Sequence, residues 1–400
     1  MIKSYSEYSF KLHIFFAFVI ASTTFTKLRG SEEHSLFPFL PQNVGPADIL
    51  FVLTILALST LRLNRTFFLY IFCFLLVVSS TMVINLYFNL YMSDKGVLHD
   101  IMAMLVNILF LSALINNKKI SIPNLLDAFY IILSIYLLLM FISGVLLEQG
   151  FFYWEYNIDN QRLSGLSRNP NQIALLVLFH SGLSLFFLDK ASTFLKRVLH
   201  FSSFLLSITI ASFVSSDALS LGLLALLFFA IIFRLPKYLA KLFIIFLISI
   251  SLVLSISNIQ PIENYLSTSF QVQERLARWL SFEHLLPQVF FVGYGPGGHG
   301  PSFEDSFSYV VGDPLKDTEF HNSFLDFFSQ YGILFTMILL SMYLYYLLKI
   351  NNAKLHLLIA LALGTFVISF FHMYTRQPLF WLLVLIPFIH QYKDKLKYKQ

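Results

Sequence analysis

Long runs of apolar residues recur along the whole 400-residue chain, and they constrain its fold more than any other feature. Many are close to the roughly 20 residues that a helix needs to cross a bilayer. Apolar and polar residues do not alternate within these runs, as they would in the strands of a membrane β-barrel, so helices are expected. Charged residues make up only 12% of the chain, against about 25% in soluble proteins. The sequence therefore predicts an all-α, polytopic integral membrane protein.

The apolar runs predict about twelve transmembrane helices in a single membrane domain, residues 1–400. The first run follows two lysines, as a secretory signal does, but no A-x-A-like cleavage site comes after it, so it is expected to remain as the first span. Two polar segments stand out between spans, a short one at 148–170 and a long one at 259–323 in which short helices are expected. The expected spans lie near 10–28, 46–62, 66–88, 98–116, 123–147, 171–188, 198–214, 218–234, 239–258, 324–348, 355–373 and 378–392.

The distribution of basic residues predicts the orientation. With both termini in the cytoplasm, 18 of the 27 Lys and Arg residues fall on cytoplasmic segments, as the positive-inside rule requires. The polar segments 148–170 and 259–323 then face the periplasm from a bacterial inner membrane. The net charge of +5 follows from this topology. No soluble face clusters Lys and Arg as a nucleic-acid-binding surface would.

The first polar motif is residues 162–171, Arg-Leu-Ser-Gly-Leu-Ser-Arg-Asn-Pro-Asn. Asn169 is a candidate N-cap for the following helix, which would begin at the proline. Arg162 and Arg168 beside a helix N-terminus form a candidate anion site, since guanidinium groups and free N–H groups both bind phosphate. In the alternative interpretation the arginines contact lipid head groups, and Asn169 and Asn171 only cap the helix.

The second motif is residues 272–280, whose apolar side chains recur at helical spacing and include a tryptophan. This pattern is typical of an amphipathic helix at the membrane surface. Arg275 and Arg278 lie three residues apart and therefore share one face of such a helix. They either bind the phosphate of a lipid carrier or simply contact head groups.

The third motif is the glycine-rich turn Gly293-Tyr-Gly295-Pro-Gly297-Gly. Glycine permits positive φ angles and close approach of the backbone to a ligand. The turn is neither a dinucleotide-binding fingerprint nor a P-loop, because no strand precedes it and no Gly-Lys-Ser/Thr is present. Taken alone, it is more typical of a tight turn than of a binding site.

The fourth motif is His321-Asn322, which follows several acidic residues and immediately precedes an apolar run. A neutral histidine is the usual general base near neutral pH, and a nearby carboxylate makes it more basic. A lone surface histidine is otherwise simply solvated. The histidines and acids show no spacing typical of metal ligands, so neither a metal nor another cofactor is expected.

Two further ionisable residues lie at predicted outer helix ends. Asp217 follows Ser215-Ser216 in a predicted hairpin, and Arg376 precedes Gln377-Pro378. An ionisable residue at membrane depth is a functional candidate. Arg376 is therefore either a further anion ligand or an anchor whose charge reaches the membrane surface, and Asp217 is otherwise a turn acid.

Taken in order, these motifs resemble the O-antigen polymerase/ligase family of bacterial envelope proteins. The resemblance rests on Arg162 to Asn171, Arg278-Trp279, the glycine-rich turn, and His321-Asn322 followed after nine residues by Gly332. Two positions depart from the family pattern. Ser216-Asp217-Ala218 stands where the family often has Ser-Arg-Gly/Ala, and Phe335 stands where it usually has a small residue or Tyr.

The resemblance implies glycan transfer from an undecaprenyl-diphosphate donor at the periplasmic face, without nucleotide sugar or metal. In that scheme the arginines Arg162, Arg168, Arg275, Arg278 and Arg376 bind the diphosphate and stabilise the charge that develops on it. His321 is the base that deprotonates the acceptor hydroxyl, and Asn322 orients it. The expected partners are the lipid-linked oligosaccharide, membrane lipid and a chain-length regulator, with no nucleic acid.

Three functions remain open at this stage. A polymerase would extend a lipid-linked repeat unit, and the Asn-Pro-Asn segment with the glycine-rich turn favours it. A ligase would transfer the same glycan to lipid A-core. A transporter of lipid-linked sugars would be no enzyme, but transporters place polar residues and helix breaks near mid-membrane. Here the polar motifs gather at one predicted face, which favours an enzyme.

Overall fold

The computed structural model describes residues 2–28, 45–58, 72, 75–80, 83, 97–117, 119–153, 162–167, 169–236, 238–239, 293, 295, 322–348, 350, 355–372 and 374–397. Within these ranges the regular secondary structure is helical, apart from one isolated β-bridge between Tyr153 and Leu163. The predicted all-α class is confirmed. Of the predicted long outer segment 259–323, only Gly293, Gly295, and the pair 322–323 fall among these residues.

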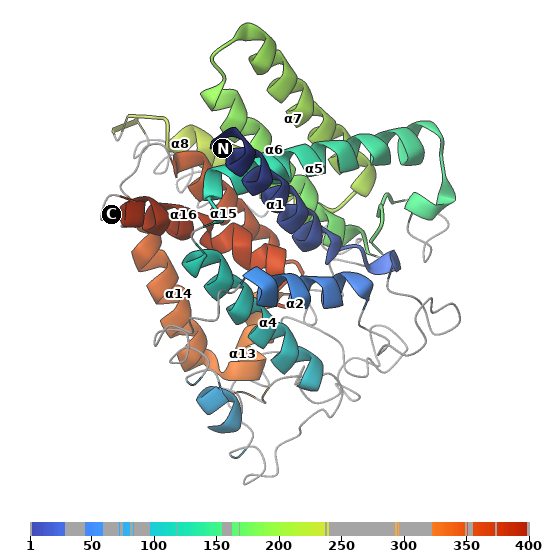
Figure 1. The fold of residues 1–400 in the computed structure, drawn as a ribbon. Helices are drawn as coiled ribbons and strands as arrows, with labels where there is room; N and C mark the ends of the chain where they lie inside the picture. Colours follow the sequence, from blue (N-terminus) through green and yellow to red (C-terminus); the bar gives the residue numbers. More distant parts are fainter. Residues whose placement is uncertain are drawn as a thin grey trace.

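The helices pack into one bundle, with the hairpin of α6 and α7 at the top of Figure 1 and α13 and α14 at the bottom. Most begin and end within a few residues of the predicted spans. Their bounds are α1 Ile2–Ser22, α2 Pro46–Leu58, α4 Val97–Asn116, α5 Ile122–Met140, α6 Pro170–Lys190, α7 Phe194–Val214, α8 Asp217–Ile232, α13 Ser323–Tyr331, α14 Ile333–Leu348, α15 His356–Ile368 and α16 Pro378–Lys397, with short helices η1 Thr26–Leu28, η2 Phe141–Leu146 and η3 Gly150–Phe152.

Among the described helices, three are long and apolar enough to cross a membrane. They are residues 122–146, which combine α5 with the π-helical turn η2, and the helices α6 and α7. Five further apolar helical segments are shorter, with 10–17 residues. The chain is therefore a membrane protein, while the number of twelve spans stays a prediction.

The predicted span 324–348 is wrong as a single helix, because it is divided at Gly332 into α13 and α14. Gly332 has a φ of 80°, a conformation that glycine adopts without steric cost. Its N–H still donates to the carbonyl of Phe328 at 2.8 Å and closes α13. The continuous apolar pattern concealed this break, since hydropathy does not report backbone dihedral angles.

Helix α6 forms the centre of the bundle. It packs against α5, α7, α8 and α15, and most of its side chains are buried. At its middle, the buried His180 forms hydrogen bonds with Ser207 Oγ at 2.6 Å and Ser134 Oγ at 2.8 Å. Because these partners lie on α7 and α5, the three helices are joined by polar contacts within an apolar layer, a common device for helix association in lipid.

Helices α8 and α15 approach closely through glycines. A Cβ atom on Gly364 of α15 would lie 2.9 Å from the carbonyl oxygen of Gly222 on α8. A Cβ atom on Gly222 would lie 2.2 Å from Cγ2 of Ile368. Small residues let helix backbones come this close in membranes, so the crossing depends on both glycines.

Replacing Gly364 by Val should therefore destabilise the protein, because the added carbons meet backbone that has no room to move. Overpacking of this kind costs about 1–3 kcal/mol. The free energy of unfolding, measured in detergent micelles, checks it. Gly150→Val is the matched control, since no atom lies within 4 Å of a Cβ there. Equal stability of the two variants would contradict the packing described.

Hydrogen bonds between helix termini define two ends of the bundle. At the end where α6 begins, which we call the site end, Ser216 and Tyr374 both donate to Asn171. Ser216 directly precedes α8, Tyr374 precedes α16, and Asn171 is the second residue of α6. At the opposite end, which we call the basic end, Arg234 after α8 pairs with Asp189 in the last turn of α6. The described residues of most polar motifs lie at the site end.

Candidate functional site

Asn171 joins three segments at the site end. Asn169 is the N-cap of α6, as predicted, and its Oδ1 accepts the N–H of Asn171 at 2.8 Å. The side chain of Asn171 then accepts the hydroxyl of Ser216 at 2.9 Å, and its carbonyl accepts the hydroxyl of Tyr374 at 2.8 Å. The Asn-Pro-Asn motif thus caps α6 and also fixes the starts of α8 and α16.

Arg162 lies beside the end of α7. Its Nε donates to the carbonyl oxygen of Val214 at 3.1 Å, and the neighbouring N–H of Leu163 donates to Phe213 at 2.9 Å. Since Val214 is two residues from Ser216, Arg162 reaches the same corner of the bundle as Asn171. A guanidinium held by its Nε keeps a fixed direction, which suits binding of a phosphate.

Lys27 ties the end of α1 to the segment after α5. Its Nζ donates to the carbonyls of Phe151 and Tyr153, and its N–H donates to Leu166 at 2.9 Å. The hydroxyl of Tyr153 donates to the carbonyl of Gly144 at 2.8 Å. Burial, with a smaller contribution from Glu148, raises the pKa of Tyr153, so the phenol remains a neutral donor. These contacts fix described residues on both sides of Arg162 in the sequence, Tyr153 before it and Leu166 after it.

Two residues of the glycine-rich motif, Gly293 and Gly295, lie against the end of α13. The N–H of Gly295 donates to the carbonyl of Gln330 at 2.9 Å. A Cβ atom on Gly293, whose φ is 69°, would lie 2.6 Å from the backbone of Gln330 and of Gly332. The turn and Gly332 are far apart in the sequence, but their backbones touch, and only glycine at position 293 permits this approach.

Asn322 begins α13 at the same end. It is buried, and its Oδ1 accepts the N–H groups of Phe324 at 2.9 Å and Leu325 at 3.2 Å. The following Ser323 donates its hydroxyl to the carbonyl of His372 at 2.7 Å and accepts the N–H of Tyr374 at 3.0 Å. Ser323, directly after the predicted site residue Asn322, is therefore attached to the segment that also contacts Asn171.

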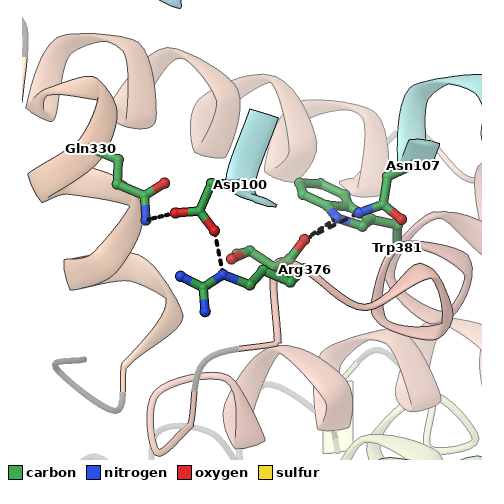
Figure 2. A network of polar contacts seen from close by, with 6 residues as sticks. Asp100, Asn107, Gln330, Arg376 and Trp381 are labelled. Carbon is green, nitrogen blue, oxygen red and sulfur yellow. Dashed lines mark hydrogen bonds and ion pairs between the residues drawn. The ribbon is translucent and has the colours of Figure 1, made fainter. Parts of the chain in front are cut away.

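At the site end, the buried carboxylate of Asp100 on α4 joins α13 to the segment before α16 (Figure 2). Arg376 donates its Nε to one oxygen of Asp100, and Gln330 donates its amide to the other at 3.4 Å. The side chain of Asp100 is 3% exposed and that of Arg376 is 25% exposed. The remaining guanidinium nitrogens of Arg376 point away from Asp100 in Figure 2.

The loop that carries Arg376 is fixed by a second pair of contacts. The carbonyl of Thr375 accepts Nε1 of Trp381 at 2.7 Å and the amide of Asn107 at 3.3 Å. Figure 2 shows Asn107 and Trp381 converging on this loop. Asn107 and Asp100 both lie on α4, so α4 positions Arg376 through its backbone neighbour as well as through its guanidinium.

The sequence interpretation missed Asp100, Gln330 and Tyr374. An acid in the first turn of a predicted span was the available signal for Asp100, because such a residue is costly in lipid unless it is paired. No such signal marks Gln330 or Tyr374, whose roles depend on contacts between distant segments. Within the described part of the chain, no group of three His, Cys, Asp or Glu side chains is arranged to hold a metal ion.

Five predicted site residues lie outside the described residues, namely Arg168, Arg275, Arg278, Gly297 and His321. Four of the predicted site residues that the structure describes are linked to one another. A continuous path of hydrogen bonds and chain neighbours leads from Arg162 through Asn171 and Tyr374 to Asn322 and Arg376. Segments separated by more than 200 residues thus meet at one end of the bundle.

Residues 200–340 match a family model described as O-antigen ligase. The chain is similar to the O-antigen ligase family. The resemblance to the O-antigen polymerase/ligase family is thereby confirmed. The match begins in α7 and ends in α14, and it includes Gly293, Gly295 and Asn322. Neither the curated proteins nor the solved structures contain a match to this chain.

The pairing of Asp100 with Arg376 should be energetically stronger than a surface ion pair. A double-mutant cycle with Asp100→Asn and Arg376→Gln should give a coupling of about 1–3 kcal/mol in unfolding free energy, since neighbours in one buried network couple by this amount. The same cycle on Asp189 and Arg234, which are 39% and 53% exposed, should give about 1 kcal/mol or less. Equal couplings would show that burial of Asp100 contributes nothing.

Proposed function

We propose that this membrane protein is a glycosyltransferase that polymerises an O-antigen-type surface polysaccharide. It transfers glycan from an undecaprenyl-diphosphate donor to a lipid-linked repeat unit at the periplasmic face of the bacterial inner membrane. In this proposal residues 1–400 form one membrane domain with both termini in the cytoplasm. Segments 148–170 and 259–323 face the periplasm.

The reaction needs a base and a stabiliser of negative charge. The acceptor hydroxyl attacks the anomeric carbon of the donor sugar while the bond from that carbon to the diphosphate oxygen breaks. The hydroxyl proton passes to His321, and undecaprenyl diphosphate leaves with the bonding electrons. Arginine side chains stabilise the charge that develops on the diphosphate. The leaving group is already activated, so the scheme requires neither metal nor nucleotide sugar.

The convergence of polar residues at the site end is the single observation that carries the proposal. Arg162, Asn171, Asn322 and Arg376 come from three separate segments and lie on one path of hydrogen bonds and chain neighbours. Arg162 and Arg376 are the diphosphate ligands proposed among the described residues, joined by Arg168, Arg275 and Arg278. Asn322 holds the start of α13 directly after the proposed base.

The basic end of the bundle supports the proposed orientation. Arg197, Arg234 and Lys393 lie at the basic end, where Lys393 donates to the carbonyl of Asn117 at 3.0 Å. Positive side chains favour the cytoplasmic side, so the site end is proposed to face the periplasm. There the prenyl tail of the donor stays in lipid while its sugars extend into water.

A ligase acting on lipid A-core is the second candidate, and one observation favours it. The family model that matches residues 200–340 is described as O-antigen ligase. Polymerase and ligase share the donor and differ in the acceptor, so the same arginines and base serve either reaction. A chain-length regulator is a proposed partner only of the polymerase.

Replacing His321 by Ala should abolish long-chain glycan while the amount of protein in the membrane stays normal, because the acceptor hydroxyl loses its base. General-base catalysis contributes about 10²–10⁴-fold, so ladders on a polysaccharide gel should disappear. His200→Gln is the matched control, since His200 is a half-buried histidine of α7 near the basic end. Normal ladders in the His321 variant would refute the assignment.

The glycan profile of a strain that lacks the gene distinguishes a polymerase from a ligase on the same kind of gel. One repeat unit on the lipid core indicates a lost polymerase. Polymer that accumulates on the lipid carrier indicates a lost ligase. Restoration by the wild-type gene, but not by the His321→Ala variant, ties either defect to the proposed base.

A further inference from the structure

A cavity of about 380 Å³ lies at the basic end, between α6, α7, α8 and α15. It is far from the residues assigned to glycan transfer, all of which gather where α6 begins. Ligand sites in helical membrane proteins are commonly found between helices, with mainly apolar walls and a few polar groups that fix orientation. This cavity has both components.

Two arginines supply the polar component. Arg234 is held from two sides, by the carboxylate of Asp189 and by Nε2 of His356, which accepts its Nε at 3.3 Å. Arg197 donates its Nε to the carbonyl of Ala191 at 3.2 Å, at the turn between α6 and α7. The lining contains one carboxylate and two guanidinium groups, so it carries net positive charge. Both arginines are exposed, and the groups that hold them fix their direction.

Apolar side chains supply the rest of the lining. Leu188 comes from α6, and Leu227, Ala230 and Ile231 come from α8. The neighbouring first turn of α7 presents Phe194, 82% exposed. In a membrane protein such a side chain contacts lipid. A charged rim above apolar walls matches a molecule with an anionic head and a hydrocarbon tail.

We propose that this cavity binds an anionic glycerophospholipid. Its phosphodiester lies between Arg197 and Arg234, and the first part of an acyl chain lies along Leu188 and Leu227. Basic pockets between transmembrane helices on the cytoplasmic side bind anionic head groups in this way. The volume accommodates the head group and the upper chain, while the rest of the lipid stays in the bilayer. The site uses none of the residues proposed for glycan transfer, and only its cytoplasmic orientation rests on the proposed function.

Native mass spectrometry of the purified full-length chain, titrated with phosphatidylglycerol or phosphatidylcholine, tests the proposal. Phosphatidylglycerol should bind more tightly. Arg197→Gln and Arg234→Gln should each weaken its binding about fivefold, the effect of about 1 kcal/mol per basic residue near anionic lipid. The matched control is Lys196→Gln, because Lys196 is an exposed cation next to Arg197 that does not line the cavity. The affinity of this variant for phosphatidylglycerol should be unchanged.

A cavity-filling variant separates a true pocket from general attraction to charge. Ala230→Phe should block lipid binding while both arginines remain. If the control Lys196→Gln weakens binding as much as the arginine variants, or if phosphatidylcholine binds equally well, the proposal fails. If glycerol 1-phosphate, which has no acyl chains, binds as tightly as the lipid, the cavity is a soluble-anion site and the lipid assignment is wrong.

Discussion

A bilayer tolerates polar side chains only where they are paired or reach water, and the arrangement of this protein follows from that constraint. Within the apolar layer the buried His180 pairs with serines of two neighbouring helices. The remaining polar residues gather at two ends of the bundle. Motifs that are distant in sequence, such as those at Asn171 and Asn322, meet at the same end through Tyr374.

The site end depends on backbone as much as on side chains. Gly332 interrupts the apolar run after α13. Near this break, Gln330 contacts both Gly295 and Asp100. Asp100 in turn holds Arg376 in one direction. Groups that bind a charged ligand work best when neighbouring contacts fix them beforehand. The buried acid of α4 and the broken helix therefore prepare the position of a residue that the sequence marked as an anion ligand.

The sequence predicted the helical class, most helix bounds and the cap at Asn169, because these depend on local hydropathy and on residues close in the chain. It did not predict the break at Gly332, since an apolar run looks continuous whatever dihedral angle its glycine adopts. It also missed the roles of Asp100, Gln330 and Tyr374, whose partners are more than 200 residues away. The motif residues indicated the family, but the contacts that join them required the fold.

In the proposed function the site end faces the periplasm, where lipid-linked glycan is available. Labelling of intact cells with a membrane-impermeant maleimide tests it most directly, after replacement of Cys73, the only cysteine, by Ser. Gln149 is exposed at the site end and Ser192 is exposed at the turn between α6 and α7. Gln149→Cys should be labelled from outside, and Ser192→Cys should be labelled only after the membrane is permeabilised. The reverse pattern would place the proposed site in the cytoplasm and contradict the account.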